Sequence, residues 1–257
     1  MKDNKKIQFF IRHIEDMIQR TIAYEFPCFT EFLMTGELQN VRSLIRQNSQ
    51  IFCAFWGGDS DCDRLIAGFF PASWDPDDTQ SFFPIDCVHI RPSSPKFSDS
   101  LNHRDFLGAI LNIGMDRSKI GDIRVCENTA YVFCHQDFSD LILNELSTVR
   151  HTSVVCEKVT STSLIPKQEY DPLYASVASP RIDSIVAAIT GLSRTKATQL
   201  IHQRLVVANH TEVSSVSHMC KDGYIISIRG YGKYMLQILE DTFTRKGKQK
   251  IIILKYI

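Results

Sequence analysis

Between residues 81 and 165, strand-like and helix-like patterns follow one another in the order strand, helix, strand, strand, helix, strand. This is the order of the ferredoxin-like split motif, which predicts two helices packed on one sheet. Many unrelated domains share the motif, so it fixes a fold and leaves the function open. The predicted elements are strands at 82–90, 122–127, 130–135 and 152–159 and helices at 103–114 and 138–149.

The regions on either side of this motif carry different patterns. Residues 1–80 are predicted to form an N-terminal α/β region, with an apolar helical stripe from Ile7 to Ile18, a helix at Glu37–Gln47 and strands at 51–56 and 64–70. Residues 166–180 contain three prolines and are predicted to be a linker without regular structure. Residues 181–257 predict two short helices on a small curled sheet, with Gly191 ending the first helix and Ser193 capping the second. The whole chain is therefore predicted to be a multi-domain α+β protein.

Length, cysteine content and charge narrow the class of protein. A chain of 257 residues is long for one domain, and no run of about 18 apolar residues predicts a membrane span. The eight cysteines include no C-x-x-C pair, which favours free thiols in a cytoplasmic protein without a metal centre or cofactor. Residues 181–257 hold 12 Lys and Arg against 5 Asp and Glu, whereas residues 1–180 hold 17 against 24. This split predicts that the C-terminal region meets a polyanion.

A dense motif opens this basic region. The stretch 181–209 follows the form R-x-D-x-x-(apolar)…(apolar)-S-R-x-x-A-x-x-(apolar)-(apolar)…V-x-x-N. It resembles the RNA-binding module named after small-subunit ribosomal protein S-four. The resemblance implies that two helices and the following strand present basic side chains to structured RNA. The matching residues are Arg181, Asp183, Val186, Leu192, Ser193, Arg194, Ala197, Leu200, Ile201, Val206 and Asn209, and the departures are Arg204, Val207 and His210.

The second helix predicts one polar face and one unusual cation. Lys196, Gln199 and Gln203 share the face opposite Ala197. Arg194 stands in the first turn, where the helix dipole disfavours a cation. A bound phosphate at this point would reverse that cost, which marks Arg194 as a candidate RNA contact.

The stretch Arg229-Gly230-Tyr231-Gly232 matches the first half of the base-stacking signature of RNA-recognition-motif domains, but Lys233 replaces its next aromatic residue. A basic and aromatic RNA-contacting strand is the favoured interpretation, and a bulged core strand is the alternative. We expect Arg229, Lys233 and the cations of "TRKGK" to surround Tyr231. The full set of candidate RNA-binding residues is Arg181, Ser193, Arg194, Lys196, Gln199, Gln203, Arg204, Asn209, Arg229, Tyr231, Lys233, Arg245, Lys246 and Lys248.

A broader resemblance covers most of the chain. Residues 103–123, followed by the basic module with "IRGYGKY" and "TRKGK", are similar to the YlmH family of bacterial RNA-binding proteins. The resemblance implies a cytoplasmic protein that binds large ribosomal subunits still carrying peptidyl-tRNA. We expect rRNA as its main partner, tRNA as a further one, and a monomeric protein. The resemblance also implies a part in ribosome-associated quality control of stalled translation. The family is encoded near cell-division genes, which leaves a division-linked adaptor as an alternative.

No catalytic motif accompanies these features. "HRD" at 103–105 lacks the asparagine of a kinase catalytic loop and predicts only a helix start. Asp59, Asp61 and Asp63 alternate like a calcium loop but lack its glycine and glutamate. The sequence therefore predicts a protein that is not an enzyme. The rival class is an RNA-modifying enzyme of the pseudouridine-synthase type with an RNA anchor, which would need a catalytic aspartate in a separate domain.

Overall fold

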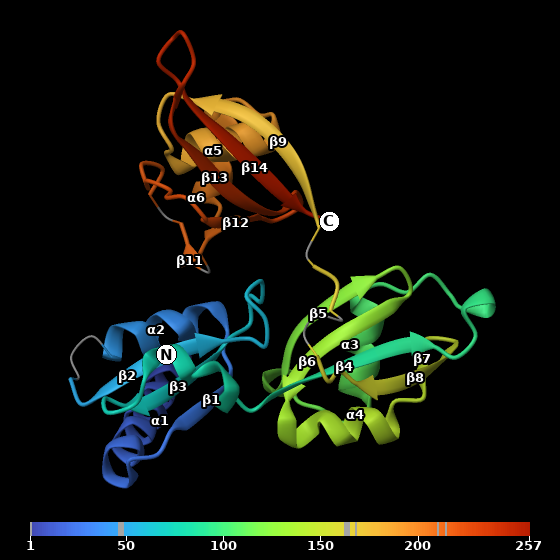
Figure 1. Cartoon of the computed structure of the whole chain (residues 1–257). Coiled ribbons are helices and arrows are strands. Elements are labelled where there is room, and N and C mark those ends of the chain that lie inside the picture. Colours follow the sequence, from blue (N-terminus) through green and yellow to red (C-terminus); the bar gives the residue numbers. More distant parts are fainter. Residues whose placement is uncertain (1, 46–48, 162–164, 168, 210, 214) are drawn as a thin grey trace. The chain divides into compact units, whose positions relative to one another are not determined.

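The computed structural model describes residues 2–45, 49–161, 165–167, 169–209, 211–213 and 215–257. The chain forms two compact units, residues 1–166 and 167–257, each with its own sheets and helices (Figure 1). The fold is of mixed α and β content with several sheets, as the sequence predicts. No helix in the described part of the chain is long and apolar enough to cross a membrane.

The first unit begins with a helix on a small sheet. In helix α1, Ile14, Met17 and Ile18 are buried in the core of this half, which confirms the later part of the predicted stripe. Ile7, at its start, is 44% exposed. The strands pair antiparallel in the order β1-β3-β2. The sequence missed β1, and residues 46 and 47 of the second predicted helix lie outside the described residues. The elements are α1 (Lys2–Tyr24), β1 (Cys28–Phe32), α2 (Thr35–Ile45), β2 (Ile51–Trp56), β3 (Ile66–Pro71) and the short 3-10 helices η1 (Pro76–Asp78) and η2 (Gln80–Phe82).

The second half of this unit has the predicted order of strands and helices, with one correction. The helix predicted at 138–149 ends at Glu145, and Thr148–Val149 form a short additional strand. The sheet of this half runs β5-β6-β4-β8-β7, all antiparallel. Helices α3 and α4 bury Phe106, Ile110 and Ile142 in the core beneath the sheet. The elements are β4 (Ile85–Pro92), η3 (Pro95–Phe97), α3 (His103–Asn112), η4 (Arg117–Lys119), β5 (Ile120–Cys126), β6 (Thr129–His135), η5 (Gln136–Phe138), α4 (Ser139–Glu145), β7 (Thr148–Val149) and β8 (Thr152–Lys158).

The two halves of the first unit share a core. One buried cluster joins Phe32 and Phe70 of the first half to Phe133 of the second half. Arg64 donates from its guanidinium to backbone carbonyls at Phe32 and Ile120, 3.3 and 2.8 Å away. The predicted boundary near residue 80 therefore lies between two halves of one compact unit.

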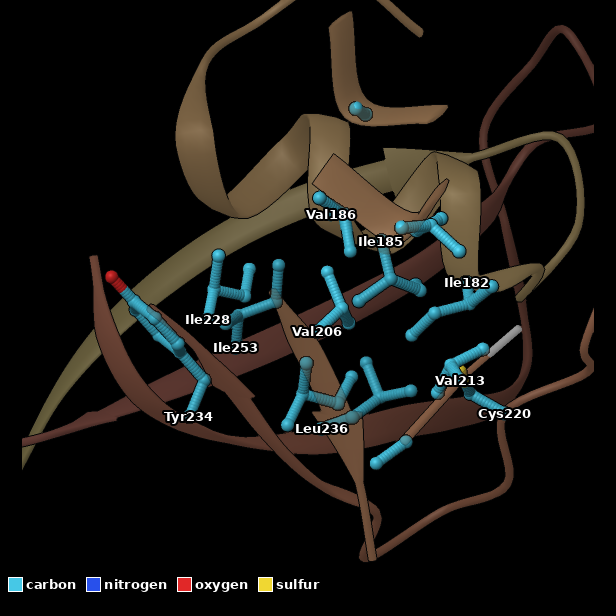
Figure 2. Packing of buried hydrophobic residues seen from close by; sticks show 14 of the residues in the cluster. Ile182, Ile185, Val186, Val206, Val213, Cys220, Ile228, Tyr234, Leu236 and Ile253 are labelled. Atoms are coloured by element: carbon cyan, nitrogen blue, oxygen red, sulfur yellow. The ribbon is translucent and has the colours of Figure 1, made fainter. Parts of the chain in front are cut away.

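The second unit packs two helices on one curled sheet. Figure 2 shows Ile182, Ile185 and Val186 of α5 pointing toward the sheet residues Val206, Ile228 and Ile253. The sheet order is β11-β10-β12-β13-β14-β9. The elements are β9 (Tyr170–Val177), α5 (Ile182–Thr190), α6 (Arg194–His202), β10 (Val206–Ala208), β11 (Thr211–Glu212), β12 (Ile225–Ile228), β13 (Gly232–Phe243) and β14 (Gln249–Tyr256).

The prediction that 166–180 lacks a regular element is wrong. Within this range, Tyr170–Val177 form strand β9, which pairs with β14 along its whole length, from Tyr170 opposite Tyr256 to Val177 opposite Gln249. The prolines that suggested a linker are compatible with this position, because β9 is an edge strand. Proline is tolerated at sheet edges, where its missing N–H can face solvent.

Candidate RNA interface

The junction between α5 and α6 is built by two capping residues. Gly191 ends α5 in the left-handed region, with φ at 69°, where a side chain would be strained. Ser193 then caps α6, because its side-chain oxygen accepts a hydrogen bond from the backbone N–H of Lys196 at 3.4 Å. Both caps were predicted. Ser193, a candidate RNA contact, thus also has a structural task.

Asp183 holds the two helices of the junction together. Asp183 is only 5% exposed, and its carboxylate forms ion pairs with Arg181 at 3.2 Å and with Arg194 at 2.5 Å. Burial raises the pKa of the Asp183 carboxyl, but hydrogen bonds from Arg194 and Arg181 outweigh burial and hold the pKa below its ordinary value. The anion that compensates Arg194 is therefore this carboxylate. The Arg194 side chain is still 60% exposed, so its outer edge remains open to a ligand.

Arg204 and Asn209 both adopt left-handed backbone conformations. Arg204 follows Gln203, the C-cap of α6, and has φ at 57°, at the place where a glycine is usual. Its guanidinium reaches Glu212 at 3.8 Å in a solvent-exposed pair of little energetic weight. Asn209 has φ at 45°, and its side-chain oxygen accepts a hydrogen bond from the backbone N–H of Ile225 at 2.8 Å. Asn209 therefore braces β10 against β12.

The remaining two positions of the module that depart from its usual pattern give less information. Val207 lies on β10 opposite Ser227 of β12. His210 lies outside the described residues.

The predicted polar face of α6 is present. Lys196, Gln199 and Gln203 are all exposed, whereas Ala197 and Ile201 are buried in the core of the unit. The spacing of the three polar residues places them on one side of the helix. This face carries one cation, and within the described residues Lys196 has no ion-pair partner.

The turn between β12 and β13 presents two of the predicted side chains. Arg229 and Tyr231 are exposed, and the Tyr231 carbonyl accepts a hydrogen bond from the Tyr234 hydroxyl at 2.8 Å. Arg229 donates its backbone N–H to the carbonyl of Leu205 at 2.9 Å, so the turn lies beside the residues that come directly after α6. The Nζ of Lys233 lies 3.8 Å from the ring centroid of Tyr256. Lys233 is thus engaged in a cation–π contact within the sheet.

The cations of "TRKGK" do not surround Tyr231, so that prediction is wrong. Arg245, Lys246 and Lys248 lie in the hairpin between β13 and β14, at the opposite end of β13 from Tyr231 (Figure 1). β13 has 12 residues, and at about 3.3 Å per residue it is roughly 36 Å long when extended. The candidate residues therefore form two groups. One gathers around α6 and the β12–β13 turn, and the other occupies the hairpin.

Elsewhere in the chain, the described residues include no cluster of His, Cys, Asp or Glu suited to a metal ion. The eight cysteines are free thiols. "HRD" begins α3 as predicted: the Asp105 carboxylate accepts a hydrogen bond from the backbone N–H of Asn102 at 3.0 Å in a capping box.

Three residues outside the candidate set shape this surface. Asp183 was recognised as a motif position, but its buried ion pairs were not foreseen. Tyr256 underlies Lys233, and Gln249 donates to carbonyls at the base of the hairpin. The partners in these contacts are between 2 and 23 positions apart in the sequence. No local sequence pattern predicts which side chains will meet.

Comparison with known proteins supports the relationship inferred from the sequence. Residues 79–163 match the protein family described as "Putative RNA-binding domain in YlmH", and they span β4 to β8. Over 223 residues the chain is 30% identical to ribosome-associated protein quality control protein P2 of Bacillus subtilis (strain 168), covering 86% of this chain and 84% of that protein. The solved structure of the cell division protein ylmH from Streptococcus pneumoniae shares the fold with a TM-score of 0.53, at 20% identity, over 63% of this chain and 95% of the other.

The fold and these matches define the class as multi-unit α+β proteins that carry a YlmH-type RNA-binding domain. More narrowly, the chain belongs to the family of the Bacillus subtilis ribosome-associated quality control protein P2 and carries the YlmH-type domain within it.

Proposed function

We propose that this protein binds structured RNA on the ribosome and takes part in quality control of stalled translation. Its target would be the large subunit that still carries peptidyl-tRNA, with rRNA as the main contact and tRNA as a further one. The protein would act by binding, as a cytoplasmic monomer, without catalysing a reaction. We assign residues 81–165 to the ferredoxin-like class and the second unit to the S-four-type module, whose two helices and following strand match the motif.

The observation that carries this proposal is the uncompensated positive charge of the second unit. Lys196, Arg229, Arg245, Lys246 and Lys248 are all exposed, and no ion pair reaches them from the described residues. Exposed cations of this kind attract the phosphates of a nucleic acid and release its counterions. Membership in the family of a quality control protein supports the ribosome as the place where that RNA is found.

The test is sedimentation of cell lysates on sucrose gradients, followed by immunoblotting for the protein. We expect the wild-type chain to travel with free large subunits. Charge reversal at Lys196 and Arg229 (K196E/R229E) should move the protein to the top of the gradient. A matched control, R12E/K96E, reverses two exposed cations of the first unit and should leave sedimentation unchanged. Wild-type protein that stays at the top of the gradient would refute the ribosomal target.

The K196E/R229E variant and an activity assay on the bound RNA separate the rival classes. A protein-interaction adaptor that works through its acidic first unit would keep its cellular effect in the K196E/R229E variant. An enzyme anchored to RNA would lose its cellular effect in this variant. In that case, however, the purified wild-type protein would change the mass or the nucleoside composition of the bound RNA. We expect neither change after incubation with large subunits.

A further inference from the structure

The hairpin between β13 and β14 has a defined geometry at its tip. The backbone N–H of Gly247 donates to the carbonyl of Thr244 at 2.9 Å, and the side-chain oxygen of Thr244 accepts from the backbone N–H of Lys248 at 3.1 Å. Gly247 has φ at 70°, as in a three-residue hairpin loop that ends in a left-handed glycine. Arg245 and Lys246 are therefore the central residues of a closed turn, where their side chains point away from the strands.

The base of the hairpin is a bulge that one side chain pins. The pairing of β13 with β14 shifts register between Ile238 and Phe243, and Asp241 within this segment has φ at 53°. The Gln249 side-chain amide donates to the carbonyls of Leu239 and Thr242, at 2.5 and 3.4 Å. A bulge bends a strand pair and redirects the residues beyond it. The Gln249 side chain thus bonds to backbone carbonyls on both sides of Asp241. Because these hydrogen bonds fix the bulge, the direction of the hairpin is set before any ligand binds.

The charge of the hairpin differs from that of the helix junction. Arg181 and Arg194 share the carboxylate of Asp183, so much of their charge is compensated inside the protein. Arg245, Lys246 and Lys248 have no ion pair within the described residues, and no Asp or Glu occurs from Thr242 to the C-terminus. Phe243, at the base of the tip, is 54% exposed. Four residues thus concentrate three cations next to an exposed aromatic ring.

We propose that this hairpin is a second RNA contact, which binds backbone phosphates independently of the surface around α6 and the β12–β13 turn. The proposal rests on the proposed function and specifies the ligand. The two contacts lie at opposite ends of β13, which would be roughly 36 Å long if it were fully extended. The RNA therefore has to offer phosphates at both places, as a folded RNA element does and a short single strand of a few nucleotides does not.

The hairpin has the features of a phosphate contact, because its cations are of the kind that bind backbone phosphates. Such contacts do not depend on the base sequence of the nucleic acid. Gln249 acts as a positioning residue, since it touches the backbone of the bulge and carries no charge. Replacing the cations should consequently change the salt dependence of RNA binding, whereas replacing Gln249 should not.

The experiment measures binding of the full-length chain to purified large-subunit rRNA at salt concentrations from about 50 to 200 mM. R245Q/K246Q/K248Q should weaken binding by about 10-fold or more and lower the slope of log K against log salt by roughly 2–3, one unit for each lost phosphate contact. R245K/K246R/K248R keeps the charges and should bind like wild type. Q249L should weaken binding a few-fold with an unchanged slope.

The outcomes separate this inference from the proposed function. If wild-type protein does not bind the rRNA, the proposed function fails, and the inference fails with it. If wild type binds and K196Q/R229Q weakens binding, while R245Q/K246Q/K248Q keeps wild-type affinity and slope, the hairpin is not an RNA contact and the proposed function stands. A loss of affinity in the hairpin variant with an unchanged salt slope would also overturn the phosphate contact. Equal loss on a short single-stranded oligonucleotide would overturn the two-point arrangement.

Discussion

The guanidinium of Arg194 lies 2.5 Å from the carboxylate of Asp183, so the first residue of α6 is tied to the first turn of α5. Arg181, directly before α5, pairs with the same carboxylate at 3.2 Å. One buried anion thus fixes the angle between two short helices, neither of which has more than nine residues. Helices of this length gain most of their stability from packing and such contacts, because they are too short to be stable alone.

Replacing Asp183 by asparagine should destabilise the second unit. The variant D183N leaves two arginines without their anion and should lower the free energy of unfolding by about 1–3 kcal/mol. Denaturant unfolding followed by circular dichroism measures the loss, with the exposed Asp171→Asn as the matched control. Stability equal to wild type would show that Asp183 does not hold the helices.

The effect of Asp183 should also depend on pH. Because its folded-state pKa is lowered, its stabilisation is fully present above the ordinary Asp pKa of about 3.9. This stabilisation is lost as the pH falls through the lowered folded-state pKa. The difference in unfolding free energy between wild type and D183N should therefore be constant near neutral pH and shrink in acid. A difference that grows below the ordinary Asp pKa would contradict the assignment.

Replacing Arg204 by glycine should stabilise the protein. Arg204 holds a left-handed conformation that costs an ordinary residue about 1 kcal/mol and costs glycine almost nothing. We expect R204G to raise the free energy of unfolding by about 0.5–1 kcal/mol, because its exposed pair with Glu212 contributes little. R204A removes the same ion pair and keeps a side chain at this φ, so it should not stabilise. If R204A raised the free energy of unfolding as much as R204G, the stabilisation would come from removing the charge and not from relieving the backbone.

Lys233 should affect stability more than RNA binding. Its ammonium group lies over the Tyr256 ring, and Tyr170 packs edge-on against that ring at a centroid distance of 5.0 Å. K233Q should lower the free energy of unfolding by about 0.5–1 kcal/mol. Its salt-dependence slope for rRNA should match that of wild type. A slope lowered by about one would instead identify Lys233 as a phosphate contact.

Local signals accounted for much of the fold. Gly191 and Ser193 mark the end of α5 and the start of α6 because caps are read from a few adjacent residues. The strand and helix order of 81–165 was predictable in the same way, from periodicity and turns. Strand β9 escaped because its pairing partner, β14, lies about 80 positions away, and because Pro172 resembles a chain breaker.

The candidate site was less predictable than the fold. Tyr231 and Arg245 are only 14 positions apart in the sequence. Because the extended strand β13 lies between them, they are far apart in space. Ser193, Arg204 and Asn209 match or occupy motif positions, yet each has a backbone task in the structure. Motif membership alone does not distinguish a residue that shapes the surface from one that touches a ligand.

The proline that concealed β9 has a consequence for how copies of this protein behave in a crowded solution. An unprotected edge strand offers a row of backbone donors and acceptors on which another chain can add a strand and begin to aggregate. Pro172 removes one donor from the open edge of β9, next to the exposed ring of Tyr174. The residue thus interrupts the template for edge-to-edge association between copies of the chain.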